Sequence, residues 1–191
     1  IDDNEDVLPI KHKKEHVLNE LPASLNDALR AFLVARTIRN LRGQADKHAT
    51  MLVNASRFTD VQGILRTRLH EALDNIQNSL RVNGANGDAA DHDPEIARLK
   101  RVWNDEFFDS GFEWSEVRAA LHRAAVSAKV VEVNSARNGL DYSSSGKQGV
   151  TVIAVGGFSL SRGLTLEGLT TTYFLRNSMM YDTLMQMGRW F

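Results

Sequence analysis

Two short segments near the carboxyl end of the chain carry residue types suited to phosphate chemistry. The first is Ser161-Arg162-Gly163-Leu164-Thr165, and the second holds Gln186, Gly188 and Arg189. Phosphoryl transfer is catalysed mainly by positive charge placed around the γ-phosphate, and one well-placed arginine supplies a large share of that charge. Arg189 is the candidate catalytic arginine, because it follows a glycine and lies about one helical turn from Gln186 on the same face.

Apolar strand patterns come before both segments and must position them. One strand, Val150–Val155, runs into Gly156-Gly157, and another is predicted at 171–175; two more are predicted at 50–53 and 129–133. Apolar residues at helical spacing predict helices over 24–43, over 59–80, from Asp93 through Trp103 and over about 114–125. We expect Ser24, Thr59 and Asp93 to cap three of these helices.

Strands separated by helices favour parallel pairing with right-handed crossovers. The sequence therefore predicts an α/β fold, a three-layer sandwich with a mainly parallel sheet. The helices within about 83–126 have no strand between them and are expected to form a helical insertion, which opens with a loop at 83–93. Residues 1–22 are polar and mixed in charge, and we interpret them as a linker to a single domain over 23–191.

Composition narrows the class of protein. The chain has 191 residues, 42% of them apolar and 25% charged, with a formal net charge of −1 and no cysteine. The absence of cysteine fits a reducing compartment, so we expect a cytoplasmic protein; no apolar run is long enough to span a membrane. Because the net charge is close to zero, any contact with nucleic acid must come from a local patch. The chain starts at Ile1 and ends at Phe191 inside an apparent helix, so we expect a fragment of a longer protein.

Polar residues follow each predicted strand. Ligands of parallel α/β sheets bind beyond the carboxyl ends of the strands. We therefore expect four pairs of residues to gather at this edge: Ser56-Arg57, Asn134-Ser135, Gly156-Gly157 and Asn177-Ser178.

The order of these segments resembles a known family. Segment 161–165, followed after one strand by Gln186-x-Gly188-Arg189, resembles motifs V and VI of superfamily-two helicases and translocases, and 51–62 occupies the place of motif IV. Residues from about 20 to 191 look more specifically like the Z-one domain, with matching stretches at 21–32, at 51–59 and from Gly157 to the end. This domain is fused to such ATPases in bacterial restriction and defence systems and is often labelled a putative endonuclease domain.

The resemblance implies that the domain is the second RecA-like lobe of a DNA-dependent ATPase or translocase. ATP with Mg²⁺ would be held mainly by a first RecA-like lobe of the same parent chain, and double-stranded DNA and a nuclease subunit are the implied partners. The implied cofactor-binding residues are Gly157, Arg162, Gly163, Thr165 and Gly188. Thr165 departs from the aspartate that many helicases carry at this position.

The candidate nucleic-acid contacts are Ser56, Arg57, Asn134 and Ser135. For Arg57, and for Gln62, the start of a surface helix is an equally good interpretation, and Asn134 and Ser135 equally suit a helix cap.

Other functions stay open at this point. The sequence has no phosphate-binding loop of the Walker type, so the chain alone is not expected to hydrolyse ATP. A nuclease or DNA-binding module carried by an ATPase is the alternative function, and an interaction domain with surface arginines is a third. The pattern His12-Lys-Lys-Glu15-His16 matches a zinc-peptidase motif, but it lies in the polar segment, where the spacing is better explained as chance.

Overall fold

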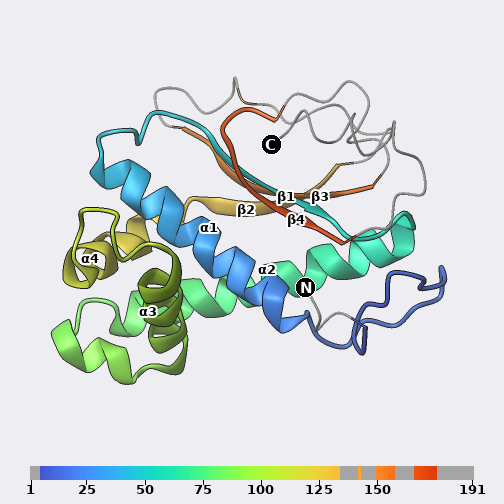
Figure 1. Cartoon of the computed structure of the whole chain (residues 1–191), viewed down its shortest axis with the longest axis horizontal. Coiled ribbons are helices and arrows are strands. Elements are labelled where there is room, and N and C mark those ends of the chain that lie inside the picture. Colours follow the sequence, from blue (N-terminus) through green and yellow to red (C-terminus); the bar gives the residue numbers. More distant parts are fainter. Residues whose placement is uncertain (1–4, 134–141, 143–148, 158–165, 176–191) are drawn as a thin grey trace.

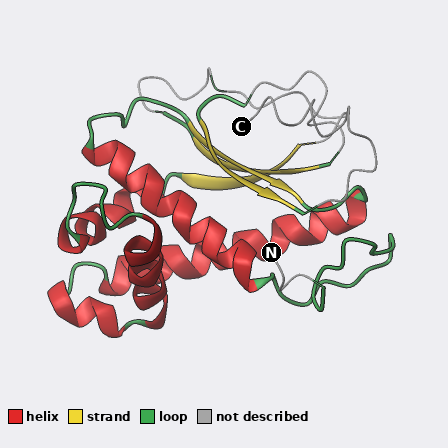
Figure 2. Ribbon diagram, in the orientation of Figure 1, coloured by secondary structure: helices red, strands yellow, loops and turns green. Residues whose placement is uncertain are grey.

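The described residues of the protein form a parallel β-sheet of four strands. The computed structural model describes residues 5–133, 142, 149–157 and 166–175. The strands are β1 (Ala49–Asn54), β2 (Ala128–Val133), β3 (Thr151–Gly156) and β4 (Leu169–Phe174), and their order in the sheet is β2-β3-β1-β4. Each neighbouring pair is parallel, which confirms the α/β class and is consistent with a RecA-like layout (Figures 1 and 2).

The described helices lie on one side of this sheet. α1 (Ala23–Leu41) and α2 (Thr59–Asn83) pack directly on it, as Figure 1 shows. The short 3₁₀ helix η1 (Gly87–His92) leads into α3 (Pro94–Glu106) and α4 (Trp114–Ala125), which pack on α1 and α2 away from the sheet. The helices predicted without a strand between them are therefore present as an added helical layer.

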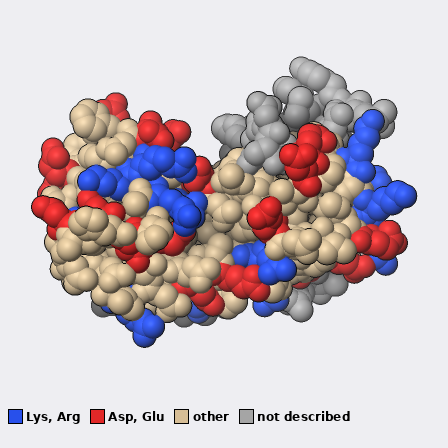
Figure 3. All heavy atoms as spheres, turned by 90° about the horizontal axis from the view of Figure 1, so that it is seen from below, with Lys and Arg blue, Asp and Glu red and all other residues tan. Residues whose placement is uncertain are grey.

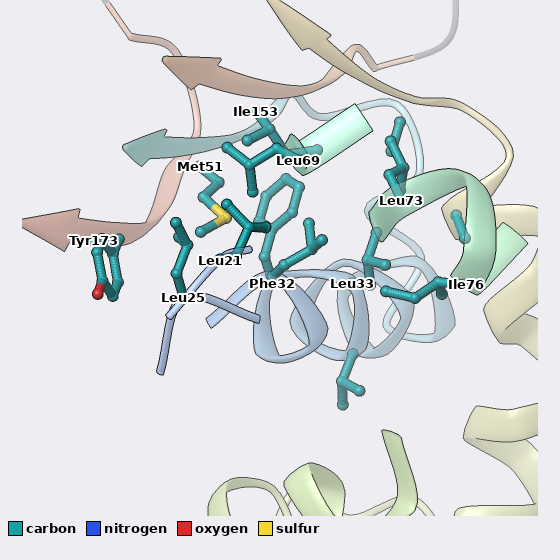
Figure 4. Close-up of a cluster of buried hydrophobic side chains, with 14 of the residues drawn as sticks. Leu21, Leu25, Phe32, Leu33, Met51, Leu69, Leu73, Ile76, Ile153 and Tyr173 are labelled. Atoms are coloured by element: carbon teal, nitrogen blue, oxygen red, sulfur yellow. The ribbon is translucent and has the colours of Figure 1, made fainter. Parts of the chain in front are cut away.

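The main core lies between the sheet and the first two helices. In Figure 4, Phe32 of α1 lies among Met51 of β1, Ile153 of β3 and Leu69 of α2, and all four side chains are fully buried. Removing such side chains from water contributes roughly 1.5–3 kcal/mol each. The opposite face of the sheet is also apolar, with a second buried cluster made of Leu52, Val133, Val152, Ala154 and Leu166. Both faces of the central strands are covered, which explains their nearly uninterrupted apolar sequences.

Two of the three predicted helix caps are wrong. Ser24 lies inside the first turn of α1, where Pro22 occupies the cap position, and the Ser24 hydroxyl is 3.0 Å from the Tyr173 hydroxyl of β4. Thr59 is the first residue of α2, whose cap position is held by Phe58 with no side-chain hydrogen bond. Proline and phenylalanine carry no side-chain acceptor, so neither helix receives the capping bond that the sequence pattern indicated.

Asp93 confirms the third predicted cap. Its carboxylate accepts hydrogen bonds from the backbone N–H groups of Glu95 and Ile96, at 2.9 and 3.1 Å. Pro94 follows at the first helical position, where a missing N–H costs nothing. The predicted stop of α1 is also present: the helix ends at Leu41, and Gly43 adopts a φ of 78°, which favours glycine.

The predicted loop at 83–93 is instead partly helical. Residues 87–92 form η1, and Ala90 is completely buried against the helical layer. Asp91 accepts hydrogen bonds from Trp114, Arg118 and Lys100. These contacts order a segment whose composition alone indicated a loop.

The amino-terminal segment packs on the domain. Leu8, Leu18 and Leu21 are buried in the main core, although the polar composition of residues 1–22 favours a linker. Arg68 of α2 donates a hydrogen bond to the Leu18 carbonyl, which fixes the end of the segment. Isolated leucines in a charged stretch have no periodicity, so no local pattern indicates this packing.

Candidate functional site at the carboxyl edge of the sheet

The chain leaves β1 and β3 in opposite directions. From β1 it passes through α2 to β2, on the β3 side, whereas from β3 it crosses to β4, on the far side of β1. Parallel sheets bind ligands at such a switch point, just beyond the carboxyl ends of the two strands. The residues that follow β1 and β3 therefore form the candidate site.

Gly157 and the turn after β1 meet at this point. A Cβ atom on Gly157 would lie 2.5 Å from Nε2 of Gln62 and 3.0 Å from the carbonyl oxygen of Ser56. Gln62 Nε2 also donates a hydrogen bond of 2.9 Å to that Ser56 carbonyl. The absence of a side chain at 157 thus lets the end of β3 pack against the start of α2, and two of the predicted site residues, Ser56 and Gly157, are brought together.

The Ser56 hydroxyl is held by two hydrogen bonds within the protein. It accepts one from the Phe58 backbone N–H, at 3.1 Å, and lies 2.8 Å from Nε2 of His12. Nδ1 of His12 is 2.7 Å from the Pro9 carbonyl, which can only accept. In the neutral ring Nδ1 therefore carries the proton, and Nε2 accepts from the Ser56 hydroxyl. With 3% of its surface exposed, Ser56 shapes the turn from inside.

Arg57 is the exposed cation of this turn. Its guanidinium lies over the Phe58 ring, 4.7 Å from the ring centroid. No carboxylate in the described part of the chain forms an ion pair with it. A cation stacked on an aromatic ring keeps its outer N–H groups available for an anionic ligand. Gln62, in contrast, is 3% exposed, so its side chain belongs to the interior.

Asn54 is a site residue that the sequence analysis missed. It is the last residue of β1, and its backbone carbonyl accepts a hydrogen bond from the Leu175 N–H. The residue is 1% exposed, and Oδ1 has no hydrogen-bond partner among the described residues. An unpaired buried acceptor is costly, so this oxygen is suited to receive a donor from a ligand. The sequence signal that could have found Asn54 is its position as the polar residue directly after the apolar run Met51–Val53.

Comparison with models of known protein families identifies the family of this chain. The model of the Z1 domain, the Z-one domain named above, matches residues 24–191. The chain belongs to the Z1 domain family. No curated protein and no solved structure matches this sequence. The match begins after Ala23, so the packed segment at 5–22 lies outside the part of the chain that defines the Z1 domain.

Most of the other predicted site residues of the Z1 domain lie outside the described residues. These are Asn134, Ser135, Arg162, Gly163, Thr165, Gln186, Gly188 and Arg189, together with the pair Asn177-Ser178. Their roles stay predictions from the sequence.

The histidines of the zinc-like pattern have other contacts. Both ring nitrogens of His12 are used as described above, and Nε2 of His16 is 2.8 Å from the Val7 carbonyl. Within the described ranges of the Z1 domain and its leading segment, no group of three or more His, Cys, Asp or Glu could hold a metal ion. In the same ranges no helix is long and apolar enough to cross a bilayer.

Proposed function

We propose that this Z1 domain acts as the second RecA-like lobe of a DNA-dependent ATPase or translocase of a bacterial restriction or defence system. The observation that supports the proposal is the close packing of Gly157 on Ser56 and Gln62 at the switch point of the parallel sheet. Two segments far apart in the sequence are joined there at the edge where such sheets bind ligands.

One feature of this edge fits a nucleotide directly. Oδ1 of Asn54, which is unpaired among the described residues, accepts hydrogen bonds, as a ribose hydroxyl or a base amino group would require. ATP with Mg²⁺, held mainly by a first lobe, would supply the phosphoryl group. In this proposal Arg189 places positive charge near the γ-phosphate and Gln186 orients the attacking water, while Arg162, Gly163, Thr165 and Gly188 line the nucleotide side.

In this proposal, the conformational change that follows ATP hydrolysis reaches the DNA through the turn after β1. The hydrogen bond from Gln62 to the Ser56 carbonyl ties this turn to the end of β3, so a shift at the nucleotide edge is passed on to Arg57. The exposed guanidinium of Arg57 contacts a backbone phosphate, and Ser56 keeps the turn in shape from below. Asn134 and Ser135 extend the DNA contact, and a nuclease subunit receives the signal of translocation.

The test is DNA-stimulated ATP hydrolysis by the intact parent protein. Arg189→Ala is expected to lower turnover by a factor of about a hundred or more while the circular dichroism spectrum stays unchanged. Arg81→Ala is the matched control, because Arg81 is exposed near the end of α2 and bonds only to Asn78 among the described residues. Equal turnover of a folded Arg189→Ala protein and the wild type would contradict the proposal, and Mg²⁺-dependent DNA cleavage by the Z1 domain alone would favour the nuclease alternative.

A further inference from the structure

A polar pocket lies on the helical side of the molecule, and none of the candidate site residues at the carboxyl edge of the sheet lines it. It is formed between α1, α2 and α3 and has a volume of about 430 Å³, within the range of ligand-binding pockets. The residues of its wall that matter here are Asp27, Arg30, Asn75, Glu95, Arg98 and Arg101. Figure 3, which views the helical side, shows Lys and Arg side chains gathered over the end where α3 and α4 lie, with acidic side chains around them.

Arg30 is the most deeply buried arginine of the pocket wall. Its side chain is 9% exposed, and it donates to both carboxylate oxygens of Glu95 and to Asp27, at 2.8–3.2 Å. All three of its guanidinium nitrogens are used in these bonds. Arg30 therefore holds the two carboxylates in place, and their oxygens still have lone pairs that can orient a further arginine each.

Arg98 and Arg101 use those oriented carboxylates. Nη1 of Arg98 donates to Glu95 at 2.6 Å, and Nη2 of Arg101 donates to Asp27 at 2.6 and 2.7 Å. Both side chains are more than half exposed, at 54% and 56%. Each guanidinium has five N–H donors, and these contacts use only one nitrogen of each. Among the described residues nothing else binds the outer N–H groups of these two arginines, so they are available at the pocket.

The arrangement is that of an anion site. Arg98 and Arg101 are three residues apart on α3 and so lie on the same face of the helix. Three arginines face two carboxylates in the pocket wall, which leaves one net positive charge beside the two available guanidinium edges. Two arginines fixed by carboxylates are pre-organised, and the planar guanidinium fork matches the oxygens of a phosphate.

We propose that Arg98 and Arg101 bind a phosphate group at this pocket, carried either by a DNA strand or by a free phosphorylated ligand. The DNA source rests on the proposed function and would give the helical insertion its own contact with the duplex. The free ligand does not depend on that function.

Binding of two probes by the full chain tests the site. The probes are a fluorescein-labelled duplex of about 20 base pairs, followed by anisotropy from about 50 to 200 mM salt, and inorganic pyrophosphate, followed by calorimetry. The Arg98→Gln/Arg101→Gln variant is expected to lower DNA affinity about tenfold or more and to reduce the slope of log K against log salt by about 1 for each phosphate that is no longer neutralised. Arg81→Gln, which removes one charge from the last turn of α2 at a residue that does not line the pocket, should change neither.

A second variant keeps the ion pairs intact. Asn75 is exposed on α2 and lines the pocket, so Asn75→Asp adds a carboxylate without removing a partner of Arg30, Arg98 or Arg101. Asn75→Asp is expected to weaken binding of the same probe that the double arginine variant weakens. Because it keeps the ion pairs, a loss of binding in this variant is not explained by unfolding.

The outcomes are distinct. Loss of DNA binding in both variants supports the site with DNA as its ligand, and loss of pyrophosphate binding alone supports it with a free phosphorylated ligand. Unchanged binding of both probes overturns the proposal. No ATP is used, so failure here is separate from the outcome of the Arg189→Ala test.

Discussion

Nε2 of His12 lies 2.8 Å from Oγ of Ser56, and this contact joins a segment outside the Z1 match to the turn at the carboxyl edge of the sheet. The buried Leu8 and Leu18 anchor the segment on both sides of the histidine. The turn that presents Arg57 is therefore shaped from two parts of the chain, and residues before the Z1 domain belong to the candidate site.

His12→Ala is expected to destabilise the protein by about 1 kcal/mol, because the buried Ser56 hydroxyl loses its acceptor. Urea denaturation followed by circular dichroism gives the free energy of unfolding. His70→Ala is the control, since His70 is exposed on α2 and faces only Asp74 at 3.5 Å among the described residues. Equal stability of the His12 and His70 variants would show that the contact contributes nothing to the fold.

Gly157→Ala tests the close approach at the switch point. The added Cβ would meet Gln62 Nε2 at 2.5 Å, so we expect a loss of about 1–3 kcal/mol from overpacking. Gly63 is the control, because it lies in the same helix as Gln62 and a Cβ atom there would meet no atom within 4 Å. Gly63→Ala should therefore stabilise the protein by roughly 0.5–1 kcal/mol.

The double variant separates overpacking from other causes. Gln62→Ala removes the atom that the new methyl group meets, so combining it with Gly157→Ala should cost less than the sum of the two single changes. Additive losses in thermal or urea denaturation would refute the close approach as the cause.

The N-terminal ends of α2 and α3 allow a direct comparison of a helix with a side-chain cap and one without. Asp93→Ala removes a carboxylate that caps α3 and is expected to cost about 0.5–2 kcal/mol. Thr59→Ala should leave stability nearly unchanged, because Thr59 makes no capping bond in α2. Measured losses in the reverse order would mean that the observed caps are misassigned.

Asp91 should make stability depend on pH. Burial alone would raise the pKa of its carboxyl group, but hydrogen bonds from Lys100, Trp114 and Arg118 outweigh burial, so the pKa lies below its ordinary value of 3.8. A lowered pKa in the folded state means that the ionised carboxylate stabilises the fold above pH 3.8 and that this contribution is lost as the pH falls through the folded-state pKa.

Asp91→Asn is therefore expected to cost about 1–3 kcal/mol at about pH 7 and clearly less at about pH 3. The free energy of unfolding in urea at the two pH values measures the difference. Asp105→Asn is the control on the exposed face of α3. A cost for Asp91→Asn that is the same at both pH values would rule out the carboxylate charge as its source.

The elements of the fold could be predicted because they follow from local pattern. Apolar spacing located α1 to α4, and continuous apolar runs located β1 and β3, both of which are buried on two faces. Asp93 marked the start of α3 correctly, and the end predicted at 43 lies within two residues of the last residue of α1, because caps and stops act within a few residues of the helix. Parallel pairing followed from the alternation of strands and helices.

What the sequence did not predict depends on contacts between distant residues. Ser24 has the type of a helix cap, but its hydroxyl instead meets Tyr173 of β4. Segment 83–93 has the composition of a loop, yet Asp91 is tied to three side chains of the helical layer. Strand order likewise has no local signal, so the placement of β3 beside β1 came only from the structure.

The candidate site could be predicted in part. Ser56 and Gly157 are expected at the same edge and are brought together there, because both follow a strand of one parallel sheet. Asn54 was missed because its importance lies in a buried oxygen that has no partner among the described residues, and burial has no local sequence signal. His12 belongs to a metal-like pattern in the sequence, whereas its contact with Ser56 depends on how segment 5–22 folds back on the domain.

The position of β1 in the sheet sets an order for assembly during synthesis. Val53 pairs with Val155 on one side and with Tyr173 on the other, so both neighbours of β1 emerge from the ribosome long after it. Helices α1 to α4 can form beforehand, but until β3 and β4 arrive, β1 is an apolar strand with two open edges, the kind of segment that aggregates. A nascent chain cut short before residue 151 should therefore need chaperone protection, whereas one that extends past β4 can complete its sheet.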